Sequence, residues 1–341
     1  MASLTFDTIK KMTYVRLGSS GLAISRIVLG YMSYGSAEYQ PWILPEEEGI
    51  AHIKAAYDVG INTFDTANSN GLSEIILDKA IKQLNLPREA IVVMTKVFIP
   101  VMRNPGDQWL PGTDLNGMGY VNQYGLSRKH IFDSVKHSLE HLQLDYIDVL
   151  QCHRFDNDTP ISETMQALHD VVNAGYVRYI GMSSCFAYQY YAIQNKLTPF
   201  ISMQKREMFP TLKVLEMFGV GSIPWSPLAR GLLTRSLEKQ KASKRGEIDN
   251  WMPMYDLTGE WFETILIVYG VEELATKKEV SMAQIALAWI MNKDGVAAPV
   301  VGTTSLKNLY DLLGAIHVKL TLEEMAYLEE PYKSQAVIGH F

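Results

Sequence analysis

Residues 127–182 read SRKHIFDSVKHSLEHLQLDYIDVLQCHRFDNDTPISETMQALHDVVNAGYVRYIGM, and this stretch decides the fold. Its two amphipathic segments, 128–142 and 160–174, predict helices, the first after a serine N-cap and the second with a proline in its first turn. The runs 147–151 and 179–182 are almost wholly apolar, which is typical of parallel strands buried on both faces. The stretch therefore predicts a strand, a helix and a parallel strand, the unit from which α/β folds are built.

The same alternation extends along the chain in both directions. Helical patterns occupy residues 45–59, 73–83, 128–142, 160–174, 207–218, 261–278 and 305–315. Strand-like runs occupy residues 27–30, 62–65, 91–96, 147–151, 179–182, 200–204, 221–225 and 298–302. A hairpin-like piece at residues 14–25 precedes them, and no linker or short repeat divides them. These units predict one α/β domain over residues 1–341, folded as a (β/α)8 TIM barrel.

A doubly wound parallel sheet is the rival architecture. No G-x-G-x-x-G string follows the first strand, and no G-x-x-x-x-G-K-[ST] string occurs in the chain. A dinucleotide, if one is bound, is therefore not expected to be held in the Rossmann manner.

Composition limits the class of partner. The chain has 341 residues, of which 47% are hydrophobic and 20% are charged, and its net charge is −6, which argues against a nucleic-acid or anionic-membrane partner. No run of about 18 apolar residues predicts a spanning helix, and the N-terminus resembles no secretory signal. Two cysteines make no disulfide framework. We expect a cytoplasmic protein in a reducing compartment; the composition does not decide its oligomeric state.

Polar residues stand at the carboxyl ends of the predicted strands, where a TIM barrel carries its chemistry. Asp65, Lys96 and His153 end three successive strands and must converge on one small area. Singly, each has a structural explanation, as a helix cap, a snorkelling lysine or a core histidine. Together they favour a functional site, because a lysine buried beside a carboxylate stays charged and each group tunes the pKa of the other.

Two other motifs are weaker. Residues 137–141 fit the H-x-x-E-H metal pattern but lie within a predicted helix without an evident third ligand, so a solvated face is favoured and no metal site is expected. The basic run Lys239, Lys241, Lys244 and Arg245 is interpreted as a solvated loop, with contact to a phosphate-bearing cofactor as the alternative.

Six strings, in order along the chain, resemble the aldo-keto reductases. The similarity runs from about Tyr14 to His340 and is greatest to fungal and microbial members of the aryl-alcohol dehydrogenase or potassium-channel β-subunit type. The strings are FDTA (64–67), TK (95–96), LQCHR (150–154), GMSS (181–184), IPWSPLARG (223–231) and VGTTS (301–305).

The resemblance implies a (β/α)8 barrel closed at its base by the hairpin, NADP(H) as cofactor and a small carbonyl substrate. Asp65, Lys96 and His153 match catalytic positions. The resemblance also implies a set of cofactor-binding residues. These are Ser183, Gln204 and the adjacent Ser184 at the nicotinamide amide, Trp225 stacked on the ring, Ser226, Leu228 and Arg230 at the pyrophosphate, and Gly302, Thr304, Ser305, Asn308 and Asp311 at the adenosine phosphate.

The chain departs from the family pattern in one place that matters for catalysis. The resemblance expects a tyrosine five residues after the aspartate as the proton donor, whereas Asn70 stands five residues after Asp65. About two residues, the tyrosine among them, are missing from this loop. An amide cannot supply a proton as a phenol does.

A second departure follows Gln204, where roughly ten residues of a polar loop look missing and a small insertion near residues 214–216 compensates. Three interpretations fit both departures. The first is an altered transcript or gene model that gives a damaged reductase. The second is a working reductase with another donor: Tyr31, Tyr34, Tyr120, Tyr124 or a protonated His153. The third is a barrel that keeps the cavity and catalyses a different step.

Three functions follow from these interpretations. The favoured one is NADPH-dependent reduction of an aldehyde or ketone, in which His153 orients the carbonyl oxygen and Lys96 with Asp65 supplies the electrostatics. A non-redox proton transfer (isomerisation, dehydration or cyclisation) and a cofactor-sensing subunit are the alternatives. Trp109 and Tyr120, on the loop after Lys96, suggest a bulky apolar substrate.

Overall fold

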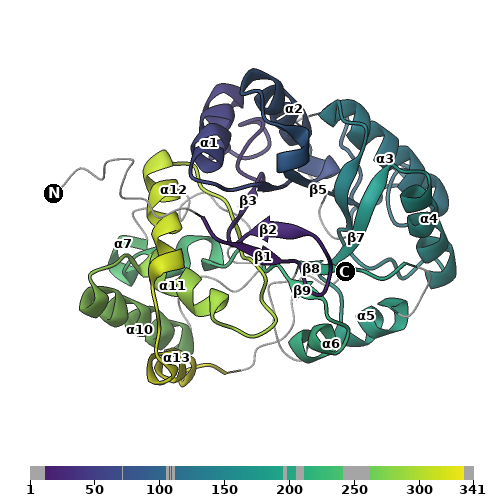
Figure 1. The fold of residues 1–341 in the computed structure, drawn as a ribbon. Helices are drawn as coiled ribbons and strands as arrows, with labels where there is room; N and C mark the ends of the chain where they lie inside the picture. Colours follow the sequence, from purple (N-terminus) through teal and green to yellow (C-terminus); the bar gives the residue numbers. More distant parts are fainter. Residues whose placement is uncertain are drawn as a thin grey trace.

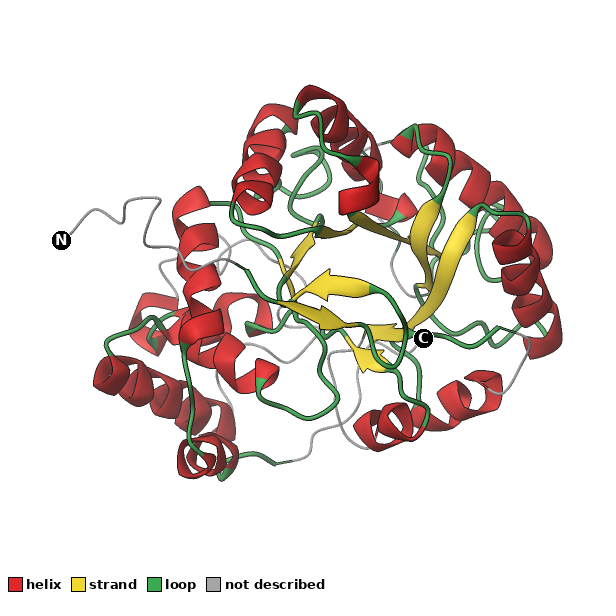
Figure 2. Cartoon of the chain, in the orientation of Figure 1, coloured by secondary structure: helices red, strands yellow, loops and turns green. Residues whose placement is uncertain are grey.

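The computed structural model describes residues 12–70, 72–104, 107, 109, 112–194, 198–204, 211–240 and 262–333. Helices form a ring around a central set of strands, and the short antiparallel pair β1 (Tyr14–Arg16) and β2 (Ala23–Ser25) crosses the end of the ring that faces the viewer (Figures 1 and 2). No helix of the described residues is long and apolar enough to cross a bilayer.

All eight predicted strands are present and parallel. They follow one another in the order β10-β3-β4-β5-β6-β7-β8-β9, and isolated parallel bridges from Ser222 to Val296 and from Trp225 to Val300 connect the two edges. The α/β barrel is therefore confirmed. The strands are β3 (Val28–Gly30), β4 (Thr63–Asp65), β5 (Val92–Val97), β6 (Ile147–Cys152), β7 (Val177–Ser183), β8 (Ser202–Gln204), β9 (Gly221–Ser222) and β10 (Val300–Val301).

The predicted helices are found with small differences at their ends, and the first residues of two of them lie outside the described residues. The structure adds four helices that the sequence pattern did not predict: α5, α7, α11 and α13. The helices are α1 (Glu46–Asp58), α2 (Ser73–Gln83), α3 (Arg128–Leu142), α4 (Ile161–Asn173), α5 (Ala187–Gln194), α6 (Thr211–Met217), α7 (Leu237–Gln240), α10 (Phe262–Lys278), α11 (Met282–Met291), α12 (Leu306–Leu313) and α13 (Leu322–Glu329).

Alternation along the strands separates two buried layers. Val28, Met94 and Val149 belong to the cluster that fills the barrel, together with Leu17 and Ile24 of the hairpin, and Leu17 and Ile24 have no exposed surface. The hairpin therefore closes the base of the barrel, as predicted.

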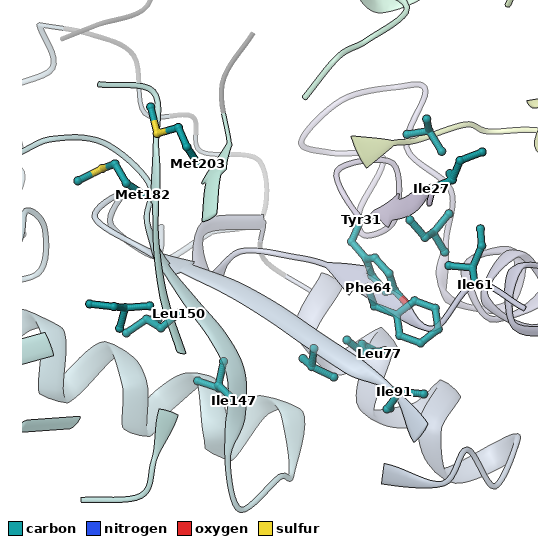
Figure 3. Packing of buried hydrophobic residues seen from close by; sticks show 14 of the residues in the cluster. Ile27, Tyr31, Ile61, Phe64, Leu77, Ile91, Ile147, Leu150, Met182 and Met203 are labelled. Atoms are coloured by element: carbon teal, nitrogen blue, oxygen red, sulfur yellow. The ribbon is translucent and has the colours of Figure 1, made fainter. Parts of the chain in front are cut away.

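The second layer lies between the strands and the surrounding helices. Figure 3 shows Tyr31, Phe64 and Leu77 packed together in this layer, with Leu150 and Met182 in the same cluster farther along the sheet. The Tyr31 ring meets the rings of Tyr34 and Phe64 edge-on, at centroid distances of 5.2 and 6.1 Å. The Tyr31 side chain thus belongs to the helix-facing layer.

Gly18 lies at the tip of the hairpin, and its substitution should destabilise the closed base of the barrel. Its φ is +60°, and a Cβ there would lie 2.3 Å from the Gly219 carbonyl oxygen and 2.6 Å from the Gly221 nitrogen. Gly18→Ala is expected to destabilise the fold by about 1–3 kcal/mol, because backbone has to move. Urea denaturation checks this, with Gly21→Ala, where a Cβ meets only an Arg16 side chain at 3.7 Å, as the matched control.

Candidate active site

Asp65 and Lys96 form a buried ion pair at the carboxyl ends of β4 and β5. Lys96 Nζ lies 2.8 Å from each carboxylate oxygen of Asp65 and donates to the Thr66 carbonyl oxygen at 2.7 Å. Both residues are only 5% exposed. Parallel pairing of β4 with β5 brings the two strand ends together, so two residues 31 positions apart meet without any long-range loop.

Two glutamine amides complete the surroundings of the Asp65 carboxylate. Gln151 Nε2 donates to Oδ1 and Gln204 Nε2 donates to Oδ2, each at 2.8 Å. Gln151 is fully buried, and its side chain passes Gly181, where a Cβ would lie 3.2 Å from Gln151 Cγ. With an ammonium and two amides as donors, the carboxylate is held in one orientation.

His153 follows β6 and borders the same site. Its backbone N–H donates to the Val97 carbonyl oxygen at 2.8 Å, and its Nδ1 is buried without a hydrogen-bond partner. Burial lowers the pKa of His153 well below the ordinary 6.5, and the charges of Arg154 and Lys96 lower it further. His153 is therefore neutral near pH 7, so the prediction that it donates a proton as an imidazolium is not supported; a neutral ring still offers one N–H to a carbonyl oxygen.

The tyrosines considered as replacement donors have other surroundings. Tyr31 borders the site, but its ring packs in the helix-facing layer, its hydroxyl is buried without a hydrogen-bond partner, and burial raises its pKa well above 10. The Tyr34 hydroxyl lies 3.4 Å from His52 Nδ1, and that of Tyr124 donates to Asn116. The Tyr120 hydroxyl accepts from the Arg103 N–H at 3.0 Å. Three of the four hydroxyl groups therefore have partners of their own, and the fourth, that of Tyr31, is buried beside the site.

One cavity of about 450 Å³ collects nearly all the candidate residues at the carboxyl ends of the strands. Ser184 and Ser305 are the exceptions. The Ser184 hydroxyl accepts from Trp225 Nε1 at 3.3 Å, and the Ser305 side chain caps α12. The candidates that line the cavity are Asp65, Lys96, His153, Ser183, Gln204, Trp225, Ser226, Leu228, Arg230, Gly302, Thr304, Asn308 and Asp311.

The loop after β9 has an unusual backbone that suits an anion. Ser226, Ala229 and Arg230 all have φ between 48° and 54°, and Gly231 has φ 107°. Successive right- and left-handed residues turn backbone N–H groups toward one side, which makes a concave binding place for phosphate. The loop thus fits the pyrophosphate of a dinucleotide, with the Arg230 guanidinium beside it.

Residues after β10 line the other end of the cavity. Gly302, Thr304 and Asn308 are there, where α12 begins. Asp311 also lines the cavity, but its carboxylate accepts from the Ser281 hydroxyl at 2.6 Å and from Gln284 Nε2 at 3.1 Å. Asp311 is thus held by α11 rather than free to turn into the cavity.

Several cavity residues were not predicted from the sequence: Ser33, Tyr39, Arg154, Thr303 and Arg235. Gln151, which holds Asp65, was also missed, although its place two residues after the interior Val149 puts it on the interior face. Trp109 lines the cavity as expected for a substrate contact, and Tyr120 does not. Lys239 lies in α7, whereas Lys241, Lys244, Arg245 and the segment 205–210 of the second departure lie outside the described residues.

The H-x-x-E-H segment lies in α3 and has a structural role. His141 Nδ1 lies 3.2 Å from the fully buried Glu74 Oε2, and Glu74 Oε1 accepts from the Thr95 hydroxyl at 2.6 Å. In the described part of the chain, no group of three or more metal-ligating side chains comes together.

The His141–Glu74 pair predicts a pH-dependent contribution to stability. The hydrogen bond with Glu74 raises the pKa of His141. The pair therefore stabilises the fold fully below about pH 6.5, and this contribution is lost as the pH rises through the raised pKa. The free energies of unfolding of wild type and His141→Gln, measured by urea denaturation, should differ by about 1 kcal/mol or less at pH 6, and the difference should shrink by pH 8.5. A difference that grows with pH would contradict the assignment.

Comparison with known proteins agrees with this geometry. The sequence profile described as "Aldo/keto reductase family" matches residues 26–333. A Schizosaccharomyces pombe protein provisionally named an aryl-alcohol dehydrogenase is 45% identical, over 94% of this chain and 95% of its own. Versiconal hemiacetal acetate reductase of Aspergillus parasiticus is 42% identical, over 96% and 98%, and an aldo-keto reductase of Metarhizium robertsii is 40% identical, over 97% and 94%. The chain therefore belongs to the aldo/keto reductase family and is an oxidoreductase.

Proposed function

We propose that this protein reduces an aldehyde or ketone to an alcohol with NADPH, as a single domain over residues 1–341 in the cytoplasm, with no nucleic-acid partner. The observation that carries the proposal is one cavity that joins the buried Lys96–Asp65 pair and His153 to Trp225 and to the loop after β9 with its positive φ angles.

The residues of the cavity fit the cofactor from end to end. Trp225 offers a planar ring for the nicotinamide, and Ser183 and Gln204 would hold its carboxamide. Because Gln204 Nε2 is used by Asp65, its carbonyl oxygen is the group left to accept from that carboxamide. Ser226, Leu228 and Arg230 would wrap the pyrophosphate, and Gly302, Thr304 and Asn308 would meet the adenosine end.

Preference for NADPH over NADH is supported by the charge along the cavity wall. Arg235 lines the cavity as a further cation besides Arg230, and a cation favours the extra phosphate of NADPH.

The proposed chemistry follows from the polar and charged residues that line the cavity at the ends of β4, β5 and β6. When bound, the nicotinamide supplies a hydride to the carbonyl carbon. His153, neutral and at the wall, donates an N–H to the carbonyl oxygen. Lys96 places a positive charge where negative charge develops on that oxygen, and Asp65 with its two glutamine amides keeps the lysine in position.

The substrate side of the cavity is apolar. Ile99, Pro100, Met102 and Trp109, from the segment after β5, line it with Met32. These side chains suit a bulky aromatic or aliphatic carbonyl compound. The aryl-alcohol and versiconal hemiacetal acetate substrates in the names of the two relatives belong to the same apolar class.

Titration with NADPH tests the proposal. Tryptophan fluorescence of the wild type should be quenched by NADPH, and the quenching should fall in Trp225→Phe while a thermal shift still reports binding. A panel of aromatic and aliphatic aldehydes should then oxidise NADPH. Absence of NADPH binding far above the usual ~µM–mM range of working concentrations would refute the proposal.

The missing tyrosine is also compatible with two other functions, and the same panel of aldehydes distinguishes them. Product formed without loss of NADPH would indicate a non-redox proton transfer. NADPH binding without turnover of any carbonyl would indicate a cofactor-sensing subunit.

A further inference from the structure

Reduction of a carbonyl leaves an oxygen that must take up a proton, and the following inference rests on the proposed function. Asn70 stands where the family has its tyrosine. His153 is neutral, and the hydroxyl groups of Tyr34, Tyr120 and Tyr124 are engaged by His52, Arg103 and Asn116. Tyr31 and Tyr39 also line the cavity, but burial raises the pKa of both hydroxyl groups, which makes them weaker acids. The charged groups of the cavity are therefore the next candidates.

Nζ of Lys96 carries three N–H bonds, and the groups around it accept from only two of them. Nζ lies 2.8 Å from both oxygens of Asp65. These two oxygens are too close together for each to accept from an N–H bond of its own, because the N–H bonds of a tetrahedral ammonium point well apart. One N–H bond therefore serves the carboxylate, and a second serves the Thr66 carbonyl oxygen at 2.7 Å. Nζ makes no further hydrogen bond to a described residue, and Lys96 lines the cavity.

We propose that Lys96 is itself the proton donor of this enzyme, giving the proton of its third N–H bond to the substrate oxygen. The carbonyl carbon gains a C–H bond from the hydride, the π electron pair moves to oxygen, and an O–H bond forms as the Nζ–H bond breaks. The carbonyl compound is reduced and the nicotinamide is oxidised. Lys96 is left as a neutral amine and regains its proton from water at the open end of the cavity.

An ammonium is a suitable replacement for a phenol in this step. Lysine and tyrosine side chains have ordinary pKa values of about 10.4 and 10, so they are acids of similar strength. An alkoxide is a far stronger base than either conjugate base, so the transfer is downhill. Asp65 and Thr66 fix two of the three N–H directions, which fixes the third without a further residue.

Lys96→Arg separates charge from proton donation, because a guanidinium keeps the positive charge but does not release a proton. With NADPH and 4-nitrobenzaldehyde we expect turnover to fall by roughly 10²–10⁴-fold, the usual effect of losing a positioned proton donor. NADPH affinity, measured by fluorescence, should stay close to that of the wild type. Lys54→Arg, whose side chain is 58% exposed, is the matched control.

Binding of 4-nitrophenol supplies a readout without turnover. Its phenolate is yellow and its phenol is colourless, so a cation that faces the cavity shifts the bound probe toward the yellow form. Wild type and Lys96→Arg should show the same shift, and the shift should be smaller in Lys96→Met, because the other cations of the cavity, Arg154, Arg230 and Arg235, are common to all three proteins. Equal shifts in the wild type and in Lys96→Met would mean that no N–H bond of Lys96 reaches the cavity, which overturns the proposal.

Amine rescue covers the case in which arginine disturbs the fold. Lys96→Met should lose turnover to the same extent and regain part of it with ethylammonium, which should not accelerate the wild type. Wild-type turnover in Lys96→Arg, or no rescue in Lys96→Met, would overturn the proposal and leave the reductase function standing. A wild type that binds NADPH but reduces no carbonyl compound would overturn both.

Discussion

Replacing Asp65 by leucine is expected to destabilise the protein by roughly 3–5 kcal/mol, because it leaves the Lys96 ammonium buried without its counter-charge. Two amide donors, on Gln151 and Gln204, lose their acceptor in the same change and add to the cost. Urea denaturation at pH 7 measures the effect. Asp58→Leu, at an exposed i,i+4 ion pair with Lys54, is the control and should change stability by about 1 kcal/mol or less.

The double variant Asp65→Leu/Lys96→Met identifies the cause. Removing both charges should recover much of the lost stability, because the uncompensated ammonium is gone and methionine fills a similar volume. Turnover should not recover. If the two substitutions were simply additive in stability, the ion pair would not be the reason for the loss, and the packing of residue 65 would have to explain it.

The strands could be predicted from the sequence because a strand buried on both faces is an apolar run whatever surrounds it. Two of the helices were missed because they show no contrast between a polar and an apolar face. α11 reads MAQIALAWIM and is buried on almost every side against its neighbours, so it has no polar face to reveal the helical period. α5 places Tyr188 and Tyr191 on its exposed surface, which removes the contrast between its faces.

In the candidate site, too, some features could be predicted from the sequence and others could not. Asp65, Lys96 and His153 could be predicted because strand order alone brings strand ends together. The partners of each side chain could not, since they depend on register and on space. Lys96 is opposite Gln151 across β5 and β6, and Ser183 is opposite Gln204 across β7 and β8. The neutral state of His153 likewise comes chiefly from its burial, the extent of which the sequence does not give, and then from the charges of Arg154 and Lys96.

His153→Leu is expected to lower kcat by about 10²–10³-fold, the usual effect of removing one hydrogen-bond donor from a developing oxyanion. His153→Gln, which keeps an N–H donor on a side chain of similar reach, should lose less.

The pH profile then tests the protonation state. Because burial and the nearby cations lower the pKa of His153 well below 6.5, its ring stays neutral over the usual assay range, and kcat/KM should show no step from this residue between about pH 6 and 8. A step in that range that disappears in His153→Gln would show that the imidazole titrates during the reaction. His153 would then be an acid in the mechanism, and the neutral donor role argued from its burial would be wrong.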